Sequence, residues 1–138
     1  MKPACLVLIA TLALAQPPSE ATMKQLMLDL IHPASNDILL FVNRGDSKSE
    51  AGWAAVRRSA LTLEESGNLL TMRGRARDQG DWMKDAKMLA DAGRAAYQAA
   101  QAKDLSALSQ ISDALDASCT TCHKQYRPNV FPREGGSK

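Results

Sequence analysis

The sequence contains few of the residues from which β-sheets are built. Its 138 residues include only four Val, four Ile and six aromatic residues, whereas Ala and Leu number 22 and 17. Ala and Leu lose little conformational freedom in a helix, while β-branched and aromatic side chains favour strands. This composition excludes an all-β sandwich or barrel, and the length fits a single domain.

A large excess of charge of either sign is also missing. The chain carries 17 basic and 15 acidic residues, which gives a formal net charge of +2, and no segment forms a dense stripe of Lys and Arg. A protein that binds nucleic acid by neutralising phosphates needs a stronger positive field. We therefore expect no nucleic-acid partner.

The N-terminal segment has the features of an export signal. Lys2 supplies a positive charge, residues 4–15 are apolar apart from one threonine, and the run ends in the small-x-small pattern Ala-Leu-Ala. An apolar run of about 12 residues is shorter than the roughly 20 that span a bilayer. We expect residues 1–15 to be cleaved as a signal peptide and the mature chain to be periplasmic, without a membrane span. A buried N-terminal helix is the alternative.

Four helical segments are predicted between residues 16 and 128. Within each segment apolar residues recur every three or four positions, which is the period of an α-helix. Side chains that can cap a helix mark the four starts, at Ser19, Ser47, Asp78 or Asp81, and Asp104. Helices of this length with short connections predict an all-α fold, an antiparallel four-helix bundle.

Proline and glycine interrupt this pattern at two places. Pro33 lies inside the first segment, where it removes a backbone hydrogen bond and clashes with the preceding turn. We therefore expect a kink near His32, or two abutting helices. Residues 129–138 contain Pro132 and two adjacent glycines and are predicted to form a flexible tail.

The motif at residues 119–123, Cys-Thr-Thr-Cys-His, carries the chemistry. On a helix, Cys119 and Cys122 lie one turn apart on one face, and His123 follows at i+4 from Cys119. This spacing allows both thiols to form thioether bonds with haem while the adjacent imidazole ligates the iron. Since Cys5 would leave with the signal, no other cysteine remains in the mature chain. The motif predicts one covalently attached haem c.

Other uses of the same side chains remain open. A disulfide between Cys119 and Cys122 would close a very short loop and fit a regular helix poorly. A thiol–disulfide oxidoreductase would need the pair at a helix N-terminus in a βαβ setting. Zinc could use both cysteines with His123 and His32, although neighbouring residues 122 and 123 are hard to bring onto one tetrahedral ion. A helical adaptor without a cofactor is a further alternative.

The motif lies late in the chain, in the last of the four predicted helices, and Lys-Gln-Tyr-Arg follows it at residues 124–127. This helix order, motif position and ending resemble the class II cytochromes c, the cytochrome c prime family. With the preceding Cys122 and His123, residues 124–127 are similar to the Cys-His-x-x-aromatic-Arg ending of that family. Class I cytochromes c place the motif near the N-terminus and match less well. The resemblance implies a single-haem bundle that carries electrons between redox partner proteins and is not an enzyme. It also allows a homodimer.

The resemblance implies a set of residues around the iron. His123 would be the proximal ligand, and in some members a methionine of the first helix ligates the opposite face. Met27 stands at that position, with Met23 and His32 as alternatives. The alternative without a ligand role is that Met27 only packs in the core. An open sixth position would suit a cytochrome c prime-like protein that binds NO or CO, or protects against stress.

Two further residues would flank the haem. Tyr126 is expected on the haem edge, and Arg127 on the proximal side, where its guanidinium could pair with a propionate. A helix-terminal arginine that offsets the helix dipole is the alternative for Arg127. The arginines of the 73–80 loop could meet propionates or an acidic redox partner. Because six aromatic residues make a modest core, we expect the chain without haem to be much less stable.

Overall fold

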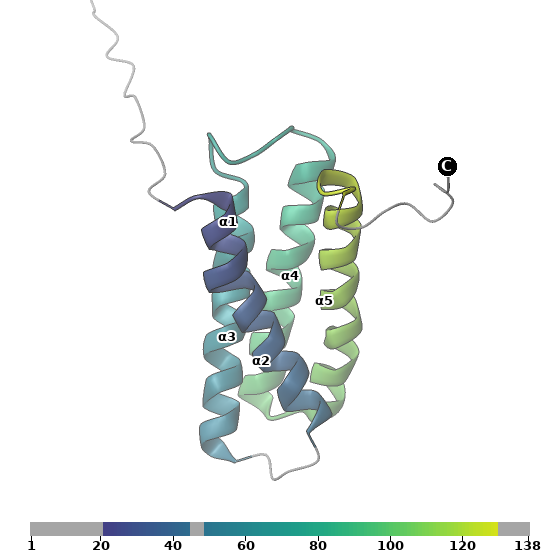
Figure 1. The fold of residues 1–138 in the computed structure, drawn as a ribbon. Helices are drawn as coiled ribbons and strands as arrows, with labels where there is room; N and C mark the ends of the chain where they lie inside the picture. The colour runs from purple at the N-terminus through teal and green to yellow at the C-terminus, as the bar shows by residue number, and fades with distance from the viewer. Residues whose placement is uncertain (1–20, 45–48, 130–138) are drawn as a thin grey trace, which may run out of the picture.

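The computed structural model describes residues 21–44 and 49–129. Every regular element in these residues is helical, which confirms the all-α prediction (Figure 1). The elements are α1 (Met23–Gln25), the π-helical segment η1 (Leu26–Ile31), α2 (His32–Asn43), α3 (Glu50–Leu70), α4 (Asp81–Ala102) and α5 (Leu105–Tyr126). The continuous run α1–η1–α2 packs against α3 and α5, and α4 packs against α3 and α5.

Several sequence predictions fall outside the described residues. These are the signal peptide at residues 1–15 and all but the first residue of the 129–138 tail. The caps predicted at Ser19 and Ser47 are wrong, because the N-caps of α1 and α3 are Thr22 and Ser49. The start of the first run is described, and there Thr22 and Gln25 form a capping box. The Thr22 N–H donates to Gln25 Oε1 at 2.9 Å, and the Gln25 N–H donates to Thr22 Oγ1 at 3.2 Å.

The first helical run passes through Pro33 as one continuous stretch with a π-helical turn. The N–H of His32 donates to the carbonyl of Met27, five residues earlier. Pro33 has no N–H, and in a regular helix its ring would clash with the carbonyl four residues before it. The wider turn of η1 lies directly ahead of the proline, and such π turns are frequent at functional sites.

Local side-chain caps define the other helix starts. Asp104 Oδ1 accepts from the Ala107 N–H at 2.9 Å, so α5 begins where the sequence predicted. Asp78 Oδ1 accepts from the Trp82 N–H at 3.1 Å and thus holds the start of α4, although the N-cap position itself is a glycine. Ser49 caps α3 in the same way.

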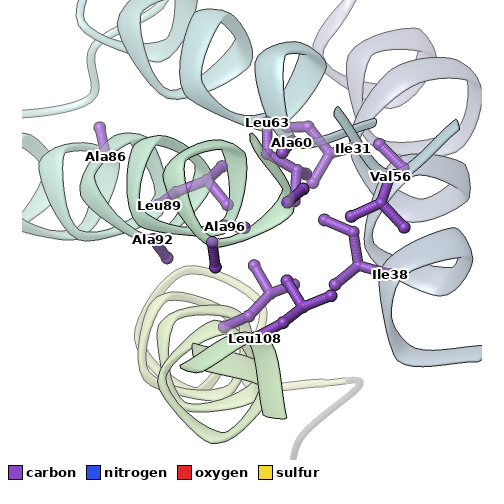
Figure 2. Packing of buried hydrophobic residues seen from close by; sticks show 14 of the residues in the cluster. Ile31, Ile38, Val56, Ala60, Leu63, Ala86, Leu89, Ala92, Ala96 and Leu108 are labelled. Carbon is purple, nitrogen blue, oxygen red and sulfur yellow. The ribbon is translucent and has the colours of Figure 1, made fainter. Parts of the chain in front are cut away.

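The core is made of small and aliphatic side chains from all the packed helices. Ile38, Ala60, Leu63 and Leu108 have no exposed surface. Figure 2 shows how the core side chains meet, and its labelled members are Ile31, Ile38, Val56, Ala60, Leu63, Ala86, Leu89, Ala92, Ala96 and Leu108. Burial of this shared apolar surface stabilises the fold.

The two tryptophans are buried and connect neighbouring helices. Trp53 is 4% exposed and meets the Phe41 ring edge-on, with 4.8 Å between the ring centroids. Trp82 is 3% exposed, and its Nε1–H donates to the Leu70 carbonyl at 2.8 Å. Trp82 thereby connects the start of α4 to the end of α3.

Glycine allows α3 and α4 to approach closely. A Cβ atom on Gly93 would lie 2.4 Å from the backbone nitrogen of Glu64 and 2.9 Å from the carbonyl oxygen of Ala60. Backbone atoms cannot move aside as a flexible side chain can. The small residue is therefore needed at this helix crossing.

We expect Gly93→Ala to lower the free energy of unfolding by about 2 kcal/mol, because overpacking outweighs the better helix propensity of alanine. Thermal melting followed by circular dichroism measures the change. Gln98→Ala, an exposed position on the same helix, is the matched control and should stay within about 0.5 kcal/mol of wild type. Equal stability of the two variants would contradict the close approach.

Candidate functional site

Two adjoining pockets lie at the end of the helical bundle that contains α1, the loop from α3 to α4 and the last turns of α5 (Figure 1). The inner pocket, about 370 Å³, has apolar side chains such as Ile31, Ala86 and Leu89 in its lining. The outer pocket, about 560 Å³, includes Met23 and Tyr126. Six residues line both pockets: Met27, Leu28, Trp82, Cys122, His123 and Arg127.

Helix α5 supplies one wall of the pockets. It continues through the motif to Tyr126, so Cys119 and Cys122 lie one turn apart on a regular helix. Both cysteines are free and half-buried, and both line the inner pocket. His123 is also half-buried and lines both pockets. The structure thus brings the three motif side chains to the same cavity.

Neither thiol is activated as a nucleophile. Burial raises the pKa of the Cys119 thiol. Burial, followed by the negative charge of Asp85, raises the pKa of Cys122 to about 11. Reactive cysteines instead have a lowered pKa, often at the N-terminus of a helix, whereas this pair lies near the C-terminal end of α5. The arrangement does not suit a thiol–disulfide oxidoreductase.

His123 is held in the form that binds metals. Its partial burial lowers the pKa of the imidazole, and the positive charge of Arg127 lowers it further. The lowered pKa favours the neutral imidazole at pH 7, which is the form in which histidine binds metal ions. Arg127 itself is exposed at the end of α5 and lines both pockets.

The run α1–η1–α2 supplies another wall, and it carries all three candidates for a second iron ligand. Met27 lines both pockets, Met23 lines only the outer one, and His32 lines only the inner one. Met27 is the candidate that shares both pockets with His123. The π turn explains why His32 also reaches the cavity, since the extra residue in that turn brings position 32 back above Met27.

Two buried polar atoms in the inner pocket were not anticipated from the sequence. Asp85 is 9% exposed, and its Oδ2 atom has no hydrogen-bond partner within the part of the chain that the structure describes. Ser35 is 8% exposed, and its Oγ atom is likewise without a partner among the described residues. Because Asp on a helix usually faces solvent, nothing in the local sequence indicates that Asp85 is buried.

The pKa of Asp85 is raised, first by burial and then by the negative charge of Asp81. The folded chain thus favours the protonated acid, and wild type should lose stability relative to Asp85→Asn as the pH rises through the ordinary aspartate range and the raised folded value. At pH 7 we expect the haem-free variant to be more stable by about 1 kcal/mol, with no difference at strongly acidic pH. Thermal melts across pH measure the gap.

The control for this prediction is Asp113→Asn, an exposed carboxylate on α5. Its stability difference from wild type should remain small at every pH. A stability gap for Asp85→Asn that does not change with pH would contradict the buried, raised-pKa assignment.

Aromatic and basic side chains surround the outer pocket. Tyr126 packs edge-on against Trp82, with 4.9 Å between the ring centroids, and its hydroxyl donates to Asp78. The guanidinium of Arg77 lies 5.8 Å from the centre of the Trp82 ring. Lys24, Arg77 and Arg127, from three separate elements, line this pocket. Of the arginines in the 73–80 loop, the structure places Arg77 in the outer pocket.

Two findings concern other kinds of site. Residues 21–44 and 49–129 contain no group of three or more His, Cys, Asp or Glu side chains arranged to hold a metal ion. Among the helices that the structure describes, none is both long and apolar enough to cross a membrane.

No protein-family model matches this chain, and searches of the curated proteins and of the solved structures also found no match.

Proposed function

We propose that this chain is a periplasmic electron carrier related to the class II cytochromes c, with one haem c attached to Cys119 and Cys122. One observation carries the proposal. His123 and Met27, from α5 and η1, line the same two adjoining pockets, and Cys122 lines them as well. A porphyrin between α5 and the first helical run would meet both attachment sites and two iron ligands.

The residues present fit haem as a cofactor. Haem has a broad apolar ring and two propionate carboxylates. The two pockets match these parts, since one has mainly apolar walls and the other has cationic side chains. The inner pocket offers apolar walls, while Lys24, Arg77 and Arg127 at the outer pocket offer cations for the propionates. Cys119 and Cys122 are free thiols that can supply the covalent attachment.

Each iron ligand has a defined role in the proposal. Neutral His123 would hold the proximal position, and the soft thioether of Met27 would hold the sixth position and raise the reduction potential. Bound haem supplies a one-electron iron couple. The buried side chains of Trp82, Ala86 and Leu89 line the inner pocket and would shield a bound haem from solvent on that side.

The function proposed is electron transfer, not enzymatic catalysis. The two thiols have raised pKa values, and the haem couple needs no catalytic acid or base from the chain. The packed helices are consistent with the antiparallel four-helix bundle of the cytochrome c prime family, which we include in the proposal. The alternative is a gas-binding member of that family, in which Met27 would leave the sixth position open.

The mass of the chain tests the proposal directly. The full chain is produced with a periplasmic haem-attachment system, denatured and measured by mass spectrometry. We expect a mass increase of one haem in wild type and none in Cys119→Ala/Cys122→Ala. A wild-type chain that is exported and reduced but carries no covalent haem would reject the proposal.

A further inference from the structure

Five cations at the pocket end of the bundle are exposed and form no ion pair with another residue that the structure describes. Within residues 21–44 and 49–129, five basic residues outside this group form ion pairs, namely Arg57, Lys84, Lys87, Arg94 and Lys103. No such pair involves Lys24, Arg73, Arg77, Lys124 or Arg127, all of which are exposed. We call these five residues the basic rim.

The carboxylates at the start of α4 are engaged by other groups. Asp78 accepts the Tyr126 hydroxyl and the backbone N–H groups that begin α4. Asp81 pairs with Lys84 at 3.0 Å. These interactions lower the pKa values of both carboxyl groups. The ammonium of Lys84 offsets the charge of Asp81, whereas Asp78 is bound by neutral donors and keeps one negative charge beside the basic rim.

Apolar side chains lie beside these cations. Leu28, in the lining of both pockets, is 56% exposed, and Met72, in the loop that also carries Arg73 and Arg77, is 46% exposed. Apolar contact within a charged rim is a common composition of protein interfaces, because the charges orient the partner and apolar burial holds it.

We propose that the basic rim is the docking surface for a redox protein with an acidic face. This inference rests on the proposed function, because electron transfer requires the partner to approach the pocket that holds the haem. The two propionates and Asp78 would offset three of the five cations, so this face stays positive in the loaded protein. A lipid surface would cover the same opening without bringing a redox centre to it, which favours a protein partner.

A gold surface coated with a carboxylate-terminated monolayer serves as the probe for an acidic face. Adsorption of the haem-loaded full chain is measured as mass on a quartz microbalance at low ionic strength. We expect wild type to bind and Arg73→Glu/Lys124→Glu to bind about tenfold more weakly, since each reversal removes an attraction and adds a repulsion. These two residues lie outside the pocket linings, so haem content should not change.

The matched control is Arg58→Glu, in the half of α3 far from the 71–80 loop. It reverses another exposed cation that forms no ion pair with any residue of the described ranges. It should bind within about twofold of wild type. Equal weakening by Arg58→Glu would show an effect of net charge alone and would overturn the docking surface. Unchanged binding of Arg73→Glu/Lys124→Glu would overturn it as well.

Two further measurements separate the remaining outcomes. Tighter binding of wild type to phosphatidylglycerol vesicles than to the carboxylate surface would identify a membrane as the occupant and overturn the protein partner. On the same gold surface, a reversible redox wave reports the haem. Normal adsorption without any redox wave would count against the proposed electron transfer, whereas a normal haem content without adsorption would count against the docking surface alone.

Discussion

Loss of the covalent haem should lower the melting temperature of this chain by roughly 15 °C or more. Without haem, the inner pocket of about 370 Å³ is left without an apolar occupant. Buried cavities destabilise proteins by about 24 cal/mol per Å³. Because this pocket opens toward the outer one, we expect a loss of several kcal/mol, on the order of 5, rather than the full product of volume and coefficient.

The comparison is made between the haem-loaded chain and Cys119→Ala/Cys122→Ala by thermal melting. The cysteine substitutions have an effect of their own, so the control is wild type produced without haem attachment. It should melt within about 2 °C of the double variant, since both cysteines are only half-buried. Equal melting temperatures of the loaded and haem-free chains would contradict a haem that fills the inner pocket.

Met27→Ala should change the iron more than any other single substitution in the first helical run. We expect the ferric protein to lose its weak far-red sulfur-to-iron band and to become high-spin. The reduction potential should fall by on the order of 0.1 V, within the roughly 0.8 V range over which axial ligands act. Visible spectra and voltammetry of the purified variant measure both changes.

Met23→Ala and His32→Ala are the controls, because these residues line only one of the two pockets. Both variants should keep the sulfur-to-iron band and bind CO slowly in the ferrous state. Loss of the band in Met23→Ala would transfer the ligand to that residue. A wild-type protein that is high-spin at neutral pH and binds CO rapidly would favour the gas-binding alternative.

Local patterns were sufficient to predict much of the fold. The apolar period predicted helices, and Asp104 predicted the start of α5. These features depend on hydrogen bonds and sterics within a few residues of each position, so they can be seen in the sequence. The placement of Cys119 and Cys122 on one helix face follows from the same local geometry.

The predictions that depended on regular helix geometry were less complete. In a regular helix, residues five positions apart such as Met27 and His32 do not share a face, whereas the π turn before Pro33 brings both to the cavity. Proline signalled a disturbance at this point. It did not determine whether the chain would break, kink or widen by one residue, because that choice depends on which side chains the neighbouring helices must bury.

The sequence by itself determined that the chain is helical and that two thiols and an imidazole occupy one end of its last helix. Only the tertiary structure decided that Met27 shares both pockets with His123, that Asp85 is buried, and that the basic rim is left without ion-pair partners in the described residues. Helix formation and capping are local, whereas burial and charge pairing depend on residues distant in sequence that packing brings together.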